Sequence, residues 1–336
     1  MKRVGHLTEK IAVLDNLYEA FLRAARGKRD RAVVMDYGDH LQENLQRLRE
    51  ELLSGEIKCG GYNFFTIYDP KQRTICAAPF RDRVLFHAVM RVCHNVFDDY
   101  QVYDSYASRV GKGTYKALER AQYYCGRYRW FAKLDVKKYF DSIDHEVMMS
   151  QLERLFKDPV LLHYFEDLLG SYEVEAGKGV PIGNLTSQYF ANHYLSVADH
   201  YAKERLGIKG LVRYMDDVLF FDDNLLHLKE LVAKYRYFVD ISLKLQLHAS
   251  VINRTSMGIP FLGYVVYEDR LRLNGRSVKR LQQKMSMLNL ELSNDIIEQK
   301  EYATRAMALL VFAQKAQCQS LLRKMSSIKG VYPQGL

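Results

Sequence analysis

The stretch Leu211-Val-Arg-Tyr-Met-Asp-Asp-Val-Leu-Phe-Phe221 sets two adjacent carboxylates, Asp216 and Asp217, between apolar residues that favour strands. This pattern predicts a tight β-hairpin with both aspartates at its turn. Hairpin packing does not require two neighbouring negative charges, which repel each other and resist burial. Bound divalent cations would compensate them, and phosphoryl transfer is the usual chemistry of a site with two cations. An Asp-Asp pair alone is more often a solvated turn, so the interpretation needs a further carboxylate.

A third carboxylate is expected on a separate strand, because two turn aspartates cannot by themselves hold two hard cations. The stretch Trp130-Phe-Ala-Lys-Leu-Asp-Val-Lys-Lys-Tyr-Phe-Asp-Ser-Ile143 supplies it. Asp135 follows a short apolar strand and precedes a turn, so it can meet a hairpin turn on an adjacent strand. Asp135, Asp216 and Asp217 are therefore the predicted catalytic residues and metal ligands. Asp144, in the same region, is predicted to cap the helix that begins near His145.

Several stretches together resemble the motifs of a reverse transcriptase. Leu134-Asp-Val-Lys-Lys-Tyr-Phe-Asp141 is similar to the first palm motif of that family, and Tyr214-Met-Asp-Asp217 to its catalytic hairpin. Gly179-Val-Pro-Ile-Gly-Asn-Leu-Thr-Ser-Gln188 has the position of the nucleotide-pocket motif. Pro70-Lys-Gln-Arg-Thr-Ile75 resembles the fingers hairpin that meets the triphosphate, and Gly258-Ile-Pro-Phe-Leu-Gly-Tyr264 the strand pair that grips the primer. Their shared order along the chain makes the resemblance specific.

The pocket motif indicates which subfamily of reverse transcriptases the chain resembles. Most reverse transcriptases carry Gln-Gly with Ser-Pro there, whereas this chain has Ile182-Gly183 with Ser187-Gln188. This variant resembles the reverse transcriptases of diversity-generating retroelements. Those enzymes copy a template RNA into cDNA with frequent errors opposite adenine, and the cDNA then diversifies a target gene.

Two alternatives stay open. The first is a retron, group II intron or defence-associated reverse transcriptase. We expect no maturase, endonuclease or RNase H domain, because little sequence follows the predicted thumb, and this disfavours a full intron protein. The second is a catalytically silent RNA-binding scaffold of the same fold, which the retention of Asp135, Asp216 and Asp217 disfavours.

The resemblance implies roles for individual residues. Two Mg²⁺ ions would be held by the three aspartates and the carbonyl of Val136, and Phe140 would exclude ribonucleotides by blocking the space for a 2′-hydroxyl. Ile182 cannot donate a hydrogen bond, so it could loosen discrimination among incoming bases. The predicted nucleotide-binding residues are Lys71, Arg73, Phe140, Ile182, Gly183 and Gln188, and the predicted nucleic-acid-binding residues are Arg276, Lys279, Arg280 and Lys284.

Composition is typical of a folded protein. The chain has 336 residues, 48% of them apolar, and a net charge of +9 that would favour a phosphate-rich partner. Such an excess also occurs in proteins that bind nothing anionic. The five cysteines have no CxxC spacing, which disfavours zinc and favours free thiols in a reducing cytoplasm. No apolar run has the length of a membrane span, and the first residues lack the apolar core of a signal peptide, so a cytoplasmic location is expected.

The mixture of helical and alternating patterns predicts an α+β protein. Helices are expected at about 40–53, 188–206, 227–240, 278–290 and 302–326, and strands at 62–68 and 73–76. The resemblance implies a right-hand polymerase fold. We therefore expect an N-terminal helical extension at 1–35, interleaved fingers and palm at 36–275, and a helical thumb at 276–336. Expected partners are template RNA, cDNA, deoxynucleotides and a small basic helical accessory protein that forms a ring.

Overall fold

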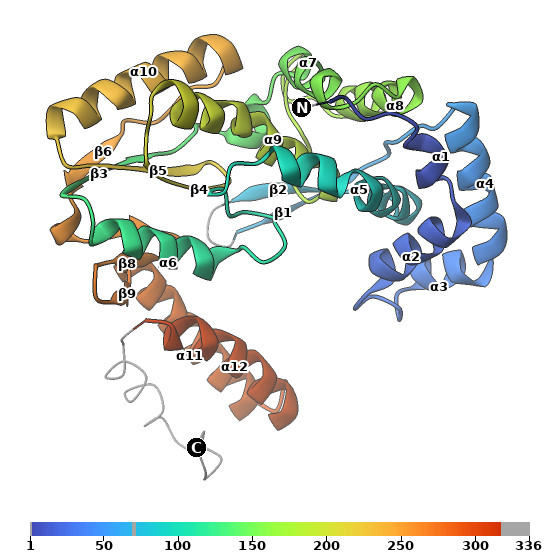
Figure 1. Cartoon of the computed structure of the whole chain (residues 1–336). Helices are drawn as coiled ribbons and strands as arrows, with labels where there is room; N and C mark the ends of the chain where they lie inside the picture. The colour runs from blue at the N-terminus through green and yellow to red at the C-terminus, as the bar shows by residue number, and fades with distance from the viewer. Residues whose placement is uncertain (1, 69–71, 317–336) are drawn as a thin grey trace.

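A four-stranded antiparallel sheet with the strand order β4-β5-β3-β6 lies between α10 and α6 (Figure 1). The computed structural model describes residues 2–68 and 72–316. The strands are β3 (Trp130–Leu134), β4 (Gly210–Tyr214), β5 (Asp217–Asp222) and β6 (Val251–Arg254). β4 and β5 form the predicted hairpin, and Asp216 lies in its two-residue turn.

Both faces of this sheet are covered, because successive side chains of a strand point to opposite sides and both sets are largely apolar. One face packs on α9 (Leu185–His200) and α10 (Leu225–Leu243), and the other packs on α6 (Thr114–Cys125) (Figure 1). The first face consists of Ala132, Leu134, Leu211, Val218 and Phe220, and the second of Phe131, Val212, Leu219 and Phe221. Polar chemistry is therefore confined mainly to the strand ends and the loops that follow them.

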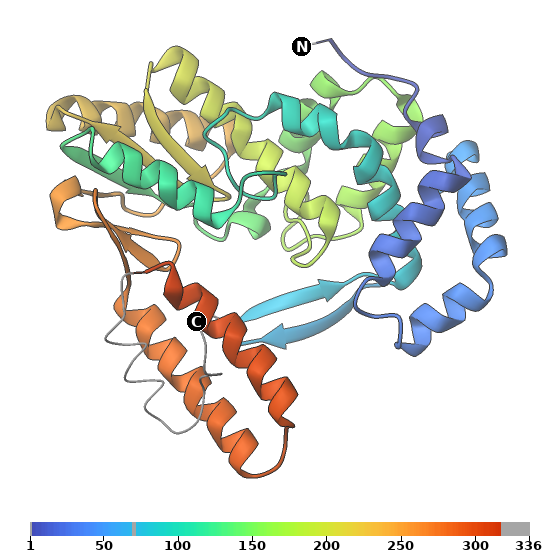
Figure 2. The ribbon, with the colours of Figure 1, turned by 60° about the horizontal axis from the view of Figure 1, so that its bottom comes forward.

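The fingers combine N-terminal helices with a projecting hairpin. The helices α1 (Thr8–Ile11), α2 (Leu14–Ala25) and α3 (Ala32–Asp39) pack on α5 (Phe80–Tyr100), and α4 (Leu41–Ser54) packs on these three helices. The hairpin consists of β1 (Asn63–Ile67) and β2 (Arg73–Ala77), and it extends from this helical body toward the C-terminal helices (Figure 2). The helix predicted at 40–53 and the two strands predicted here are confirmed.

The helix α7 (His145–Leu155) begins where the sequence predicts. The Asp144 carboxylate accepts a hydrogen bond from the Val147 amide at 3.0 Å, which confirms its role as the N-cap. After α8 (Pro159–Gly170), the chain enters α9, whose last turn continues as a π-helix over Tyr201–Arg205. Gly207 then adopts φ of 67°, a left-handed conformation that ends the helix.

A three-stranded antiparallel sheet of β7 (Ile259–Phe261), β8 (Tyr264–Val266) and β9 (Leu271–Leu273) precedes the predicted thumb. Two antiparallel helices follow, α11 (Gly275–Ser293) and α12 (Gln299–Gln314) (Figure 2). The helix expected at 302–326 thus begins earlier and ends at Gln314. Residues 317–326 of that expectation lie outside the described part of the chain.

The molecule has the predicted α+β class and the right-hand arrangement of fingers, palm and thumb. The division at residues 35 and 275 stays a prediction. Within the part of the chain that the structure describes, no helix combines the length and the apolar character that crossing a membrane demands.

Candidate active site

The register between β3 and β5 brings the predicted aspartates together. Leu134 pairs with Val218, so one further step along the ladder sets Asp135 opposite Asp217. Asp216 precedes Asp217 in the turn, where Met215 has the left-handed φ of 55° that tight hairpins require. Asp135 and Asp217 are 43% and 26% exposed, so both carboxylates are accessible at this end of the sheet.

Lys133 belongs to the same site and was not predicted. Its ammonium group lies 2.9 Å from a carboxylate oxygen of Asp217. Lys133 precedes Asp135 by two residues, so the two side chains share one face of β3. That two-residue spacing was the sequence signal that could have identified it.

The carboxyl group of Asp216 is coupled to its neighbours. Burial raises its pKa first, and the negative charges of Asp135 and Asp217 raise it further. The backbone amide and the positive charge of Arg73 oppose these effects, and the pKa settles at about 6. The three carboxylates and Arg73 of the fingers hairpin therefore act on one another electrostatically.

Arg213, on β4, binds the backbone of the turn that carries Asp216. Its guanidinium is fully buried and lies 2.6 Å from the carboxylate of Asp199 on α9. The same group donates to the carbonyl of Met215 at 3.1 Å, to Asn192 at 2.8 Å and to Gln101 at 2.9 Å. The turn is thus tied to α9 and to the end of α5. An arginine within the apolar run 211–214 was the signal for this role, and sequence reasoning missed it.

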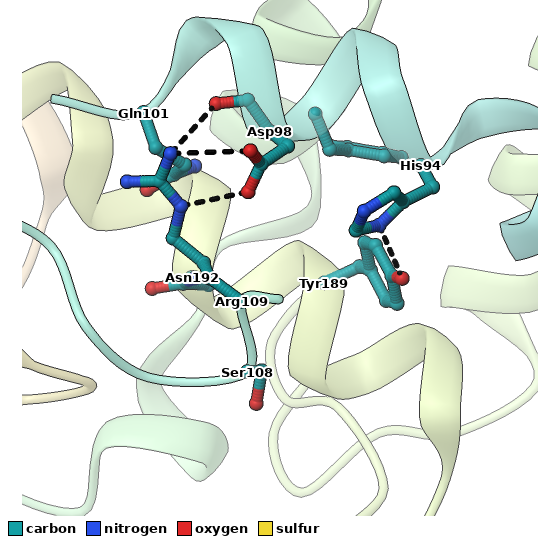
Figure 3. Close-up of a pocket in the computed structure, with 8 residues that line it drawn as sticks. His94, Asp98, Gln101, Ser108, Arg109, Tyr189 and Asn192 are labelled. Carbon is teal, nitrogen blue, oxygen red and sulfur yellow. Dashed lines mark hydrogen bonds and ion pairs between the residues drawn. The ribbon is translucent and has the colours of Figure 1, made fainter. Parts of the chain in front are cut away.

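The surroundings of Gln101 and Asn192 are packed and polar (Figure 3). Arg109 donates to Asp98 at 2.7 Å, and His94 hydrogen-bonds to Tyr189 at 2.9 Å. The hollow among these side chains admits no more than a water molecule. This region anchors the loop before α6 to α5 and is a support for the active site rather than a substrate pocket.

The predicted nucleotide-pocket motif lies against the fingers hairpin. The Cys76 amide on β2 donates to the Ile182 carbonyl at 2.8 Å. Gly183 has φ of 115°, and a Cβ there would lie only 3.0 Å from the Cγ2 of Ile75. The close neighbours of Gly183 are thus residues of β2, and its predicted role in nucleotide binding stays a prediction. Gln188 is exposed and accepts a hydrogen bond from Ser108 at 3.3 Å.

Phe140 lies in the short 3-10 helix Tyr139–Ser142 that follows Asp135. Its ring is half-buried and meets the Tyr139 ring edge-on at 5.9 Å between centroids. Its carbonyl accepts from the Val180 amide at 2.9 Å, which joins the first palm motif to the pocket motif.

The predicted thumb cations lie on α11. Arg276, Lys279 and Arg280 line a groove whose other walls include Tyr68 of the fingers and Phe312 of α12. Lys284 is one turn further along α11 and does not line this groove. Lys71, the second predicted fingers cation, lies outside the described residues.

Two further positions, Lys244 and His248, follow α10. His248 donates its amide to the Asp135 carbonyl at 2.9 Å, and its ring nitrogen lies 4.0 Å from the Asp135 carboxylate. Lys244 instead pairs with Asp144 at 2.8 Å and with Glu146 at 3.3 Å. His248 is therefore the residue at the active site.

The oxygen-rich donor set fits a hard divalent cation. The pKa of Asp216 is raised by burial first and then by the charges of Asp135 and Asp217, and a cation would favour the charged form. The bridge between Val136 and Leu247 is flanked by hydrogen bonds of Asp135 and Lys137, so the ladder does not use the Val136 carbonyl at that point. Across residues 2–68 and 72–316, no three His, Cys, Asp or Glu side chains are gathered closely enough to hold a metal unaided. Lys133 supplies positive charge to Asp217 in this arrangement.

The raised pKa of Asp216 leads to a stability prediction. The pKa of Asp216 is higher in the folded than in the unfolded chain, so folding favours the protonated carboxyl group. Its contribution to stability is fully present below the unfolded-state pKa and is lost as pH rises through about 6. Asp216→Asn removes this loss. In EDTA at pH 8 it should raise the free energy of unfolding by up to about 3 kcal/mol, because one pKa unit corresponds to about 1.4 kcal/mol. Urea unfolding at several pH values measures the effect.

The gain in the free energy of unfolding from Asp216→Asn should shrink steadily as pH falls from 7 to 4. Asp240→Asn, at an exposed position on α10, is the matched control and should change stability by less than about 0.5 kcal/mol. Equal stability of Asp216→Asn and the unaltered chain at pH 8 would contradict the raised pKa of Asp216.

Curated relatives share parts of this chain. The COX1/OXI3 intron 1 protein of Saccharomyces cerevisiae is 25% identical over 215 residues, which are 61% of this chain and 25% of that protein. Protein YkfC of Escherichia coli is 26% identical over 180 residues, covering 49% and 47%. The group II intron-encoded protein LtrA of Lactococcus lactis is 25% identical over 137 residues, covering 39% and 23%. The chain spans about half or less of the length of these relatives.

Solved structures of two telomerases are similar at a distance. The telomerase of Candida albicans in complex with a telomeric RNA fragment has a TM-score of 0.46 and 13% identity, covering 80% of this chain and 55% of that one. The apo telomerase of Candida tropicalis has a TM-score of 0.48 and 12% identity, covering 63% and 55%.

Residues 69–266 match the family described as reverse transcriptase (RNA-dependent DNA polymerase). This match spans more than half of the chain and includes β3, the β4–β5 hairpin and the pocket motif. The chain belongs to the reverse transcriptase (RNA-dependent DNA polymerase) family.

Proposed function

We propose that this protein is an RNA-directed DNA polymerase that copies a template RNA into cDNA. The observation that carries the proposal is the convergence of Asp135, Asp216 and Asp217 at one end of the palm sheet in a chain of this family. Retention of all three carboxylates also disfavours a silent RNA-binding scaffold, because such a scaffold would gain nothing from crowding like charges.

Two Mg²⁺ ions would be held by Asp135, Asp216 and Asp217 together with the carbonyl of Val136. When bound, they would activate the primer 3′-hydroxyl and stabilise the leaving pyrophosphate. The protein itself positions these ligands through the β3–β5 register and through the hold of Arg213 on the turn. His248 lies beside Asp135 and is the group available for proton transfer near the leaving group.

The remaining site residues would bind the substrates. Arg73, whose charge acts on Asp216, would contact the triphosphate, with Lys71 as its neighbour in sequence. Phe140 would exclude the 2′-hydroxyl, and Ile182, Gly183 and Gln188 would form the pocket for the base pair. The thumb cations Arg276, Lys279, Arg280 and Lys284 would contact the template–primer backbone.

For the biological role, we propose the diversity-generating type, in which the cDNA carries errors opposite template adenine. The support is the pair Ile182-Gly183 and Ser187-Gln188 in the pocket motif. A small basic helical accessory protein that forms a ring, and a cytoplasmic location, are part of this proposal. The second candidate is a group II intron-type reverse transcriptase, which the similarity to LtrA favours.

The two-metal chemistry predicts that Asp216→Asn abolishes DNA synthesis. The amide keeps the shape of the side chain but removes the negative charge that a metal ligand needs here. Primer extension on an RNA template with Mg²⁺ measures the effect, with Asp240→Asn as the control that retains activity. Extension by Asp216→Asn at a near-normal rate would refute the assignment of the active site.

The proposed sugar gate predicts that Phe140→Ala raises ribonucleotide incorporation relative to deoxynucleotide incorporation, by about tenfold or more. Removal of the ring opens space for a 2′-hydroxyl, and about 1.4 kcal/mol of lost exclusion corresponds to tenfold. Single-nucleotide extension with each sugar is the assay, and Tyr18→Ala, on the distant helix α2, is the control. An unchanged sugar preference would make Phe140 a packing residue only.

The proposed mutagenic role predicts frequent misincorporation opposite adenine, with a contribution from Ile182. Ile182→Gln restores the polar side chain of most relatives and should change the adenine error rate several-fold, because selectivity responds tenfold to about 1.4 kcal/mol. Deep sequencing of cDNA from a template with all four bases, in the presence of the accessory protein and native RNA, gives the rates.

Uniformly low errors at adenine in that complete system would remove the diversity-generating role. DNA synthesis with such low errors would still leave the polymerase proposal intact and would favour the group II intron-type alternative.

A further inference from the structure

Five side chains on the outer side of α6 and the loop before it form an alternating series of cations and rings. We name this series the palm ladder: Lys112, Tyr103, Arg120, Tyr123 and Arg127. The Lys112 ammonium lies 3.5 Å from the centroid of the Tyr103 ring. The Arg120 guanidinium lies 5.7 Å from the Tyr103 ring and 5.1 Å from the Tyr123 ring. The Arg127 guanidinium follows α6 as the last member of the series and lies 5.1 Å from the centroid of the Tyr123 ring.

The rings of the palm ladder are exposed although they are held in place. Tyr103 is 71% exposed and Tyr123 is 47% exposed, so neither ring is there to fill a core. Lys112 also donates to the Tyr103 carbonyl at 2.9 Å, and Arg109 ties the same loop to α5. A surface that is ordered before binding loses less entropy when a ligand arrives.

The palm ladder runs into a basic groove at the end of the palm sheet. Arg127, Arg129 and Arg254 line this groove together with Trp130. The Arg254 guanidinium lies 5.4 Å from the centroid of the Trp130 ring, so the alternation of cation and ring continues into the groove.

Acidic groups near this surface do not cancel its charge. Asp104 is buried and is shared by two cations, Arg120 at 2.8 Å and Lys203 at 2.7 Å. Asp223 lines the groove, and one of its oxygens accepts from the Arg129 amide at 3.0 Å. Glu268 lies close to Gly126 at the rim. Lys112 and Arg127 add further positive charge, so the combined surface is basic.

This surface is separate from the catalytic aspartates. β3 begins at Trp130 in the groove and ends just before Asp135 in the active site. With a rise of about 3.3 Å per residue, the two residues are about 16 Å apart along the strand. The groove with Trp130 therefore lies at the other end of β3 from Asp135, while the loop that carries Tyr103 runs beside β4, where the Arg213 amide donates to the Asp104 carbonyl at 2.9 Å.

We propose that the palm ladder and its groove bind single-stranded RNA outside the catalytic cleft. Unpaired bases would stack on Tyr103, Tyr123 and Trp130, and phosphates would contact the arginines and Lys112. A duplex offers no free base faces to exposed rings, so a single strand fits better. The proposal rests on the proposed function only in taking the template RNA as the natural source of this strand.

The test uses the full chain with the triple variant Lys112→Gln, Tyr123→Ala and Arg127→Gln. The probe is a fluorescently labelled, unstructured single-stranded RNA, added while a short template–primer hairpin saturates the cleft. We expect at least tenfold weaker binding by anisotropy. The slope of log affinity against log salt should fall by about 1.4, because each phosphate contact on a single strand contributes about 0.7.

The matched control is Lys229→Gln, Lys234→Gln and Tyr237→Ala on the exposed side of α10, which removes the same charge and one exposed ring. It should bind the probe as the unaltered chain does. Both triple variants should extend the short hairpin normally, which shows that they fold. If the palm-ladder variant loses RNA binding and even the unaltered chain does not extend the primer, the result supports this inference and refutes only the polymerase proposal.

Equal affinity of the ladder variant and the α10 variant for the probe would overturn the inference. The inference would also be overturned if polyglutamate displaced the RNA probe at equal charge concentration and Tyr123→Ala alone left RNA binding unchanged. That result would identify an acidic protein as the partner of this surface.

Discussion

The buried ion pair between Arg213 and Asp199 is the interaction on which the active site depends. A guanidinium without solvent contact is costly to bury, and only partners on every side make it tolerable. Here Asp199 and Asn192 come from α9, Gln101 follows α5, and the Met215 carbonyl belongs to the catalytic turn. The same charge that must be compensated thus fixes the turn relative to two helices. Loss of either charged partner would leave the other unpaired in the core.

Catalytic geometry and stability oppose each other at the end of the palm sheet. Asp135, Asp216 and Asp217 lie where β3 and β5 end, and the pKa of Asp216 is raised first by burial and then by the two neighbouring charges. Lys133 and Arg73 reduce that cost from two directions, one within the sheet and one from the fingers. The proposed cations would favour the charged form of Asp216 and so reduce this cost.

The nucleotide pocket is formed by segments that are far apart in sequence. β2 of the fingers hydrogen-bonds to Ile182, and Gly183 allows Ile75 to approach. The carbonyl of Phe140 joins the first palm motif to Val180 in the same pocket motif. A substitution at Ile182 would therefore act on the contact between the fingers hairpin and the pocket motif, in addition to any effect on the proposed base-pair pocket.

Local sequence determined the hairpin at Asp216, the strand that ends at Asp135, the Asp144 helix cap and the helix at 41–54. Each of these follows from side-chain period, capping or turn chemistry over a few residues. Tertiary structure alone decided that Lys133 would meet Asp217, that Arg213 would find Asp199, and that Gly183 would face β2 rather than open space. It also aligned Tyr103 with residues of α6. These contacts join residues from different elements, and burial and pairing of a charge are set by neighbours that no local pattern specifies.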